Sequence, residues 1–187
     1  GVHLINWGRV WPKIDYYQIF KKEAGLDLNK ATSADLIKKV RVLKLQSKFP
    51  LAQMGRGRLI DLIYKKTVRP KLIQPCFLIG HPIEISPLAK ADPKNPKKVL
   101  RFQLLAAGSE LGNGWSELND PDEQRRRFDE QMKLREAGDK EAQILDEDFL
   151  MSLEYGMPPA AGFGMSERVF SVLVDKPIRE TTFFPLM

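Results

Sequence analysis

Apolar residues in the first third of the chain recur at helical spacing. Up to about residue 64 they return every three or four positions within otherwise polar segments, which predicts helices buried along one face. The first helix is predicted to include Ile14, Tyr17 and Phe20. It is predicted to end at Gly25, because glycine readily adopts the left-handed conformation that closes many helices.

Two more helices are expected before the pattern changes. Ser33 is predicted to open the second, since a serine side chain can cap free backbone N–H groups, and Leu36 and Val40 then follow helical spacing. A third helix is predicted over residues 57–66, with Leu59 among its buried positions. We expect all three helices to serve packing rather than chemistry.

After Pro75 the pattern becomes that of strands. Residues 76–79 form a short apolar run between turn-forming residues, which predicts a buried strand. Residues 99–106 and 109–117 are predicted to be two strands joined as a hairpin at 107–108. Together with the helices, this pattern favours an α+β fold with a largely antiparallel sheet.

The remaining segments are predicted to be helices, one more strand and a loop. Residues 89–98, rich in proline and lysine, are expected to be a surface loop. A charged helix is predicted over 121–137, and another that begins at Asp146. A glycine-spaced strand then leads to a final helix over 169–175, in which three apolar residues are expected to face inward: Phe170, Leu173 and Val174.

Composition adds limits to this picture. The 187 residues suit one domain, and 43% apolar with 29% charged residues is typical of a soluble globular protein. No apolar run approaches the roughly 20 residues that span a bilayer, and no secretion signal is visible, so we expect no membrane contact. The single cysteine, Cys76, predicts a zinc-free protein of the reducing cytoplasm. The net charge of +6 weakly favours a polyanionic partner.

The segment GSELGNGWSELND, residues 108–120, is the first place where chemistry is expected. Alternate residues of a strand share a face, so Asn113, Trp115 and Glu117 would point the same way. A carboxylate, an aromatic wall and an amide can together hold a small cationic ligand. The bare backbone at Gly112 suits a bulge or a ligand that lies close to it. A solvated edge strand explains the same pattern equally well.

A second candidate is GFGMSER, residues 162–168. Gly162 and Gly164 leave one side of the strand free for a flat group, while Phe163 and Met165 pack behind. Arg168, near the start of the next helix, is suited to phosphate because of its fork of donors. A tight packing contact between strand and helix would also explain the glycines.

Other polar residues are weaker candidates for a functional site. The arginines at 125–127 are interpreted as a solvated helix face rather than a nucleic-acid contact, and His81 is interpreted as structural. The chain has no Walker A motif, no GxSxG elbow and no HExxH pair, which argues against those NTPase and hydrolase classes.

Four strings identify a family. They resemble, in order, the C-terminal catalytic segments of bacterial-type lysyl-tRNA synthetases, most densely from about residue 72 onward. The strings are FLIGHPIEISPLAK (77–90), ELGNGWSELNDPDEQRRRF (110–128), DEDFLMSLEYGMPPAAGFG (146–164) and IRETTFFPLM (178–187).

The resemblance implies the C-terminal part of one class II synthetase catalytic domain, normally in a homodimer. Residues 1–71 would be a mostly helical segment, and residues 72–187 would hold the sheet, charged helices and motif 3. The implied reaction joins lysine and ATP into lysyl-adenylate and passes the lysyl group to tRNA(Lys), in the cytoplasm.

The resemblance also implies roles for individual residues. Glu110 falls on a carboxylate used for Mg²⁺ and ATP, and Asn113, Trp115 and Glu117 fall on the lysine pocket. Three motif 3 residues fall on the ATP site, and the last of them contacts the phosphates as the catalytic arginine: Gly162, Gly164 and Arg168.

Three departures from the family pattern affect what the chain can do. Gln103 stands where a second metal-binding Glu is usual, and an amide is a poorer ligand for Mg²⁺. Motif 3 is one residue short, and these 187 residues hold no motif 1, motif 2 or anticodon-binding domain. We therefore expect negligible aminoacylation from the chain alone. Two alternatives stay open, a lysine-activating paralogue that modifies a protein and a non-catalytic binding module derived from a synthetase.

Overall fold

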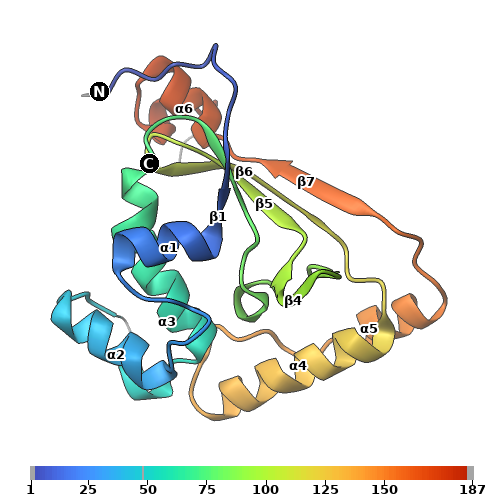
Figure 1. The fold of residues 1–187 in the computed structure, drawn as a ribbon. Helices are drawn as coiled ribbons and strands as arrows, with labels where there is room; N and C mark the ends of the chain where they lie inside the picture. Colours follow the sequence, from blue (N-terminus) through green and yellow to red (C-terminus); the bar gives the residue numbers. More distant parts are fainter. Residues whose placement is uncertain (1–2, 48, 185–187) are drawn as a thin grey trace.

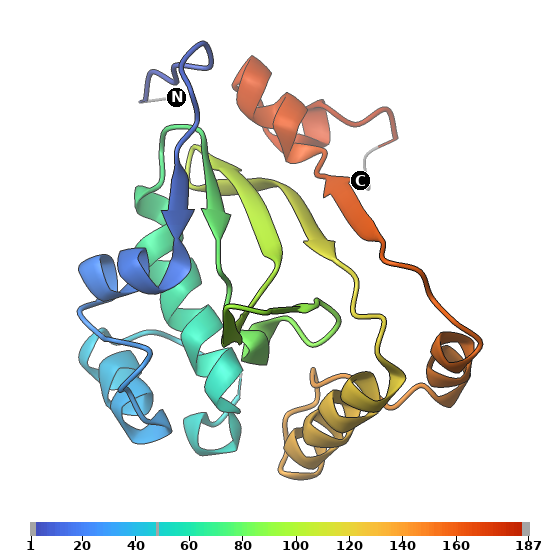
Figure 2. The same ribbon diagram turned by 45° about the vertical axis from the view of Figure 1, so that its right-hand side comes forward.

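A five-stranded sheet forms the centre of the molecule (Figures 1 and 2). The structure is a computed structural model that describes residues 3–47 and 49–184, so the last three residues of the string 178–187 lie outside it. The strand order is β1-β2-β5-β6-β7; β1 and β2 are parallel and every other neighbouring pair is antiparallel. The strands are β1 (Lys13–Asp15), β2 (Cys76–Ile79), β5 (Arg101–Ala106), β6 (Ser109–Ser116) and β7 (Ala161–Met165).

Helices flank this sheet, which confirms the predicted α+β fold with a mainly antiparallel sheet. Their bounds are α1 (Tyr16–Ala24), α2 (Ser33–Val42), α3 (Arg56–Ile63), α4 (Pro121–Glu136), α5 (Glu147–Glu154) and α6 (Arg168–Val174). In both views α1–α3 gather beside β1, and β7 connects α5 at one end of the molecule to α6 at the other (Figures 1 and 2). Among the described residues, no helix has the length and apolar character needed to cross a membrane.

The first helix confirms its predicted end but not its predicted start. Gly25 closes α1 with a φ of 70°, and its N–H donates to the carbonyl of Lys21. Ile14 was predicted to be helical, and this was wrong, because residues 13–15 pair with β2 as a strand. Asp15 then caps α1 by accepting a hydrogen bond from the N–H of Gln18.

The next two helices lie close to their predicted ranges. The cap of α2 is Thr32 rather than Ser33: the Thr32 hydroxyl accepts from the N–H of Asp35, and the Asp35 carboxylate accepts from the N–H of Thr32. The third prediction, 57–66, covers α3 and the first part of a single wider helical turn, Tyr64–Val68. That turn places the Tyr64 hydroxyl next to the sheet.

One buried core joins α1, α2 and α3 to the sheet. Leu78 and Leu105, from neighbouring strands, pack against the helices and are fully buried. His81 is 1% exposed and lies 5.2 Å from the ring of Tyr16, as expected for a structural histidine. Burial lowers the pKa of His81 to about 3, with a contribution from the charge of Arg101, so the imidazole is neutral at pH 7.

The hairpin predicted at 107–108 is confirmed. Both turn residues, Ala107 and Gly108, have positive φ (53° and 68°), the geometry of the tight turns that suit twisted strands. A Cβ on Gly108 would lie 3.1 Å from the Pro70 backbone. The N–H groups of both turn residues donate to the carbonyls of Ile73 and Leu72, which holds the strained turn in place.

Two further predictions were wrong. Residues 89–98 are not a plain loop, because β3 (Ala91–Asp92) and β4 (Asn95–Val99) form a small antiparallel ladder there. The apolar side of α6 does not face inward, because the main contacts of α6 with other described elements are those with β6 and the turn at Ile178–Glu180. Its apolar residues are consequently 64%, 53% and 54% exposed, respectively: Phe170, Leu173 and Val174.

Candidate functional site

The candidate polar residues lie on the face of the sheet that the helices partly cover. The pairing of β5 with β6 places Asn113 opposite Gln103 and Trp115 opposite Arg101, and directly opposed residues share a face. Gln103 also lies opposite Leu78, a core residue beneath the helices. Asn113 and Trp115 therefore continue the core face outward, beyond the edge of the helical layer.

The two motif 3 glycines lie beside these residues on β7. Gly164 pairs with Asn113 and Gly162 pairs with Trp115. A Cβ on Gly162 would lie 2.8 Å from Oε1 of Glu117, so the absence of a side chain there leaves room for that carboxylate. A Cβ on Gly164 would meet nothing within 4 Å, so the backbone beside Asn113 is open.

The glycines of β6 have a packing explanation on the opposite face. A Cβ on Gly114 would lie 2.8 Å from the ring of Phe102 and from the carbonyl of Gly162. A Cβ on Gly112 would lie 2.9 Å from the ring of Phe163, which stacks on Phe102 at 5.8 Å. The aromatic rings cross β6 above its two glycines, so these positions are bare because rings cover them.

Trp115 and Glu117 are joined directly. The indole Nε1–H of Trp115 donates to Oε2 of Glu117 at 2.7 Å. That bond fixes the carboxylate beside the aromatic ring and leaves Oε1 to accept from another group. The predicted combination of a charge and an aromatic surface for a cationic ligand is therefore present in the geometry.

Arg101 is a site residue that the analysis of the sequence did not single out. Its Nε–H donates to Oδ1 of Asn113 at 3.0 Å, and Nη1 donates to the carbonyl of Ile85 and the hydroxyl of Ser86. Its guanidinium lies 6.0 Å from the centroid of the Trp115 ring, within reach of a cation–π interaction. Burial lowers the pKa of Arg101, but an arginine remains charged in proteins.

This arginine orients Asn113. Because Oδ1 of Asn113 accepts from Arg101, its NH₂ group points away from the guanidinium and is available to donate to another acceptor. Strand periodicity could have pointed to Arg101, since Arg101 and Gln103 are two residues apart in the predicted strand and therefore share a face. Its partners on the Ile85–Ser86 loop, however, come from a distant part of the chain.

A β-bulge brings Glu110 to the same face. Leu104 pairs with Gly112, but Leu105 pairs with Glu110, so β6 has one extra residue at this point. Without the bulge, alternation would direct Glu110 away from Asn113. With it, Oε2 of Glu110 accepts a hydrogen bond from Nε2 of Gln103 at 2.7 Å.

Two hollows that share part of their lining lie over this face. The smaller, about 150 Å³, is lined by Arg101, Asn113, Trp115 and the loop 85–89. The larger, about 680 Å³, shares Arg101 and extends to Tyr64, Gln103 and Glu110. A third hollow of about 970 Å³ lies between α4, α5 and the segment that joins them, and its lining contains none of the candidate residues.

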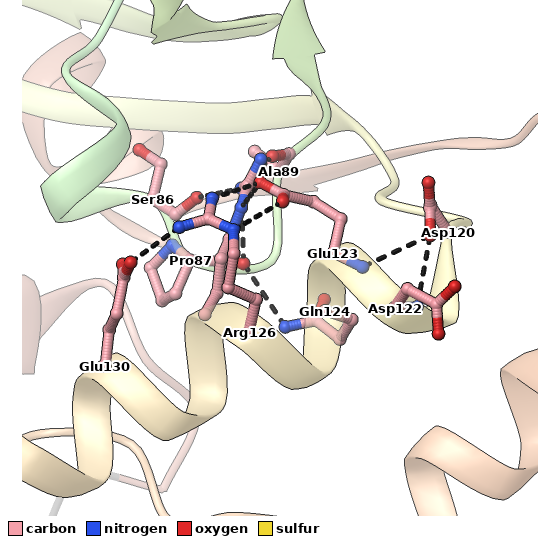
Figure 3. A network of polar contacts seen from close by, with 10 residues as sticks. Ser86, Pro87, Ala89, Asp120, Asp122, Glu123, Gln124, Arg126 and Glu130 are labelled. Carbon is pink, nitrogen blue, oxygen red and sulfur yellow. Dashed lines mark hydrogen bonds and ion pairs between the residues drawn. The ribbon is translucent and has the colours of Figure 1, made fainter.

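The helix α4 positions the loop that walls the smaller hollow (Figure 3). Arg127 is only 3% exposed; its Nη1 donates to the carbonyl of Ala89 at 2.7 Å, and Glu123 accepts from its Nε at 2.8 Å. The interpretation of 125–127 as a solvated face was therefore wrong for Arg127. Helical spacing places it on the side of α4 that meets the loop 86–89, where an arginine can satisfy several carbonyls.

Arg168 lies just after β7, close to the bulge of β6. The N–H of Ser166 donates to the carbonyl of Leu111, within the bulge that carries Glu110. Arg168 begins α6 two residues later, and its side chain is exposed. Glu110 and Arg168, two of the four residues predicted to contact ATP, therefore come from the same end of the β6–β7 pair.

The residues present fit one divalent cation that arrives with phosphates. Within residues 3–47 and 49–184, no group of three or more His, Cys, Asp or Glu side chains is placed to hold a metal. Glu110 presents a single carboxylate whose Oε1 is not used by Gln103. Mg²⁺ commonly binds through one or two carboxylates and substrate phosphates, and that chemistry matches this donor set.

Known proteins match this chain over almost its whole length. A family model described as tRNA synthetases class II (D, K and N) covers residues 3–187. Lysine–tRNA ligase of Moorella thermoacetica is 45% identical over 95% of this chain, and that of Thermosipho africanus is 42% identical over 98%. Lysine–tRNA ligase of Halalkalibacterium halodurans is 40% identical over the full chain.

The chain spans about a third of the length of these relatives, 36% in the first two and 37% in the third. The match to the family model extends over both the helical layer and the sheet. The chain belongs to the class II tRNA synthetases of the D, K and N family.

Proposed function

We propose that this chain is a catalytic portion of a lysine–tRNA ligase, which activates lysine with ATP and transfers the lysyl group to tRNA(Lys). The observation that carries the proposal is the bonded pair of Trp115 and Glu117 beside Asn113, on a face with a hollow of about 150 Å³. The names of the relatives favour lysine, and they give no support to a protein-modifying paralogue or a non-catalytic module.

In this proposal Glu117 selects the substrate. Its carboxylate pairs with the side-chain ammonium of lysine, and the Trp115 ring supplies a cation–π surface next to it. The NH₂ group of Asn113, oriented by Arg101, donates to an acceptor oxygen of the amino acid. A neutral side chain of similar length would leave the carboxylate unpaired, which gives specificity for lysine.

In this proposal the nucleotide lies at the end of the β6–β7 pair, between Glu110 and Arg168. Arg168 neutralises phosphate charge, and the open backbone at Gly164 admits a flat group close to the strand. Glu110 would hold a divalent cation, and the positive charge of that ion would offset the phosphate charge while the lysine carboxylate attacks. Catalysis in this proposal is positioning and charge neutralisation, without a covalent enzyme intermediate.

The remaining parts of the proposal concern the complete protein. We infer a homodimer that acts in the cytoplasm with tRNA(Lys), ATP and Mg²⁺. The chain spans about a third of its relatives' length, so we expect the 187 residues alone to have negligible aminoacylation activity. Robust charging of tRNA(Lys) by the chain alone would contradict this expectation.

The test is lysine-dependent ATP–pyrophosphate exchange by the complete gene product. We expect exchange with lysine, and a loss of at least about 100-fold in kcat/KM in Glu117→Gln, since a charged pair is replaced by an amide. Glu154→Gln removes the same charge from the surface helix α5 and serves as the control. Exchange that is absent with lysine, or unchanged in Glu117→Gln, would refute the proposed function or the role of Glu117, respectively.

A further inference from the structure

Gln103 occupies a fixed position between two elements. It is 6% exposed, and its amide lies between the hydroxyl of Tyr64 and the carboxylate of Glu110. An ionised carboxylate only accepts hydrogen bonds, so the NH₂ end of Gln103 must face Glu110. The carbonyl end then accepts from the Tyr64 hydroxyl at 3.2 Å, so both ends of the amide have a partner in this orientation.

The support for this amide is rigid on both sides. Tyr64 is 2% exposed and belongs to the core cluster beneath the sheet. Glu110 lies at the β-bulge, whose pairing with Leu105 sets its direction. Because both partners of Gln103 are held by the fold, the amide cannot rotate away from Glu110 without leaving buried polar groups unpaired.

As a consequence, one oxygen of the Glu110 carboxylate already accepts a hydrogen bond from Gln103. The NH₂ nitrogen of an amide has no lone pair to offer a metal, and its hydrogens point toward Oε2 of Glu110 at a donor–acceptor distance of 2.7 Å. A cation bridging the two side chains would meet N–H groups in place of a second carboxylate. Oε1 remains the oxygen through which Glu110 can bind a metal.

We propose that Gln103 is a positioning residue that restricts this site to one divalent cation, bound through Oε1 of Glu110 and the nucleotide phosphates. A second cation bridged between β5 and β6 is excluded. This inference rests on the proposed nucleotide site, and it goes further by stating how many ions this chain's own residues hold there. Arg101 lines the same hollow and contributes a fixed positive charge to it.

The test counts Mn²⁺ ions bound by the complete gene product, by electron paramagnetic resonance, with a non-hydrolysable ATP analogue. We expect one tightly bound Mn²⁺ per nucleotide in the wild type. Gln103→Glu places two carboxylates side by side and should raise the number to two. Gln131→Glu is the matched control, since it adds the same charge to the lining of the same hollow from α4 rather than from β5, and should leave the number at one.

A second variant tests positioning separately from charge. Gln103→Leu keeps the size of the side chain but removes its hydrogen bond to Glu110, so we expect one Mn²⁺ with an affinity reduced at least tenfold, as is typical when the partner of a metal ligand is lost. Unchanged affinity in Gln103→Leu would overturn the positioning role.

Two bound ions in the wild type, or one ion in Gln103→Glu, would overturn the restriction to one cation. Exchange activity measured on the same samples is a separate readout. A failure of lysine-dependent exchange would refute the proposed function, whereas the ion count decides the role of Gln103.

Discussion

The two ends of the chain have similar apolar spacing but opposite burial. In the helical layer, Phe20 and Leu59 are fully buried against the sheet. In the C-terminal region, Phe170 on α6 is 64% exposed, and Phe163 and Met165 on β7 are 58% and 67% exposed. Other described residues therefore cover the apolar side chains of the helical layer but leave those of the C-terminal region exposed.

The comparison separates two kinds of information in an apolar pattern. Spacing indicates which side of a helix is to be covered, because side chains three and four residues apart share a face. It does not indicate what covers that side. A contiguous exposed apolar surface is typical of an interface, so we expect the surface around α6 and β7 to gain a covering in the assembled protein.

The largest expected effect is the loss of a core ring. Phe20→Ala should lower the free energy of unfolding by about 3–5 kcal/mol, because it removes a fully buried aromatic side chain and leaves a cavity. Phe170→Ala, the matched change on α6, should alter it by less than about 0.5 kcal/mol in the 187-residue chain. Urea unfolding of both variants checks this, and equal losses would remove the contrast between the two regions.

The next effect concerns the pH dependence of the buried side. The folded-state pKa of His81 is lowered to about 3, so the unfolded chain binds more protons between that value and about 6.5. The contribution of His81 to the free energy of unfolding is fully present above about pH 6.5. It falls as the pH drops toward 3, by at most about 1.4 kcal/mol per pH unit. His81→Leu should remove this slope in unfolding measured from pH 7 to pH 4. A slope of the same size in the variant would mean that other groups cause it.

The smallest expected effect contrasts two glycines of neighbouring strands. Gly114→Ala should cost about 1–3 kcal/mol of stability, because the added Cβ would meet the Phe102 ring and the Gly162 carbonyl at 2.8 Å. Gly164→Ala should be close to neutral in the isolated chain, since nothing lies within 4 Å of its Cβ. Thermal unfolding of the two variants is the measurement, and a large loss in Gly164→Ala would show that this position is already covered in solution.

Sequence predictions were most successful where local chemistry decides the structure. The strand 76–79, the hairpin at 107–108 and the end of α1 at Gly25 were all predicted, because turn residues and apolar runs act within a few positions. Strand alternation also placed Asn113 and Trp115 on one face, as the pairing with β5 confirms. The assigned roles in binding stay predictions, as does the division of the domain at residue 71.

Predictions failed where a partner from elsewhere in the chain decides the structure. Ile14 became a strand because β2 lies beside it, and the two ends of the segment 89–98 are held by bridges to Glu117 and Pro82. Arg127 was interpreted as solvated, but carbonyls of the loop 86–89 surround its guanidinium. None of these partners can be recognised from local composition.

The sequence by itself determined the fold class, the order of the elements apart from β1, β3 and β4, and the polar alternation along β6, since each follows from spacing and turn chemistry within a short segment. Only the tertiary structure decided that Glu110 joins the face of Asn113, that Arg101 orients the amide of Asn113, and that Gln103 engages Glu110. The physical reason is the pairing of strands: one extra residue at the bulge reverses the direction of the side chains that precede it, and that shift depends on the register with β5 rather than on β6 alone.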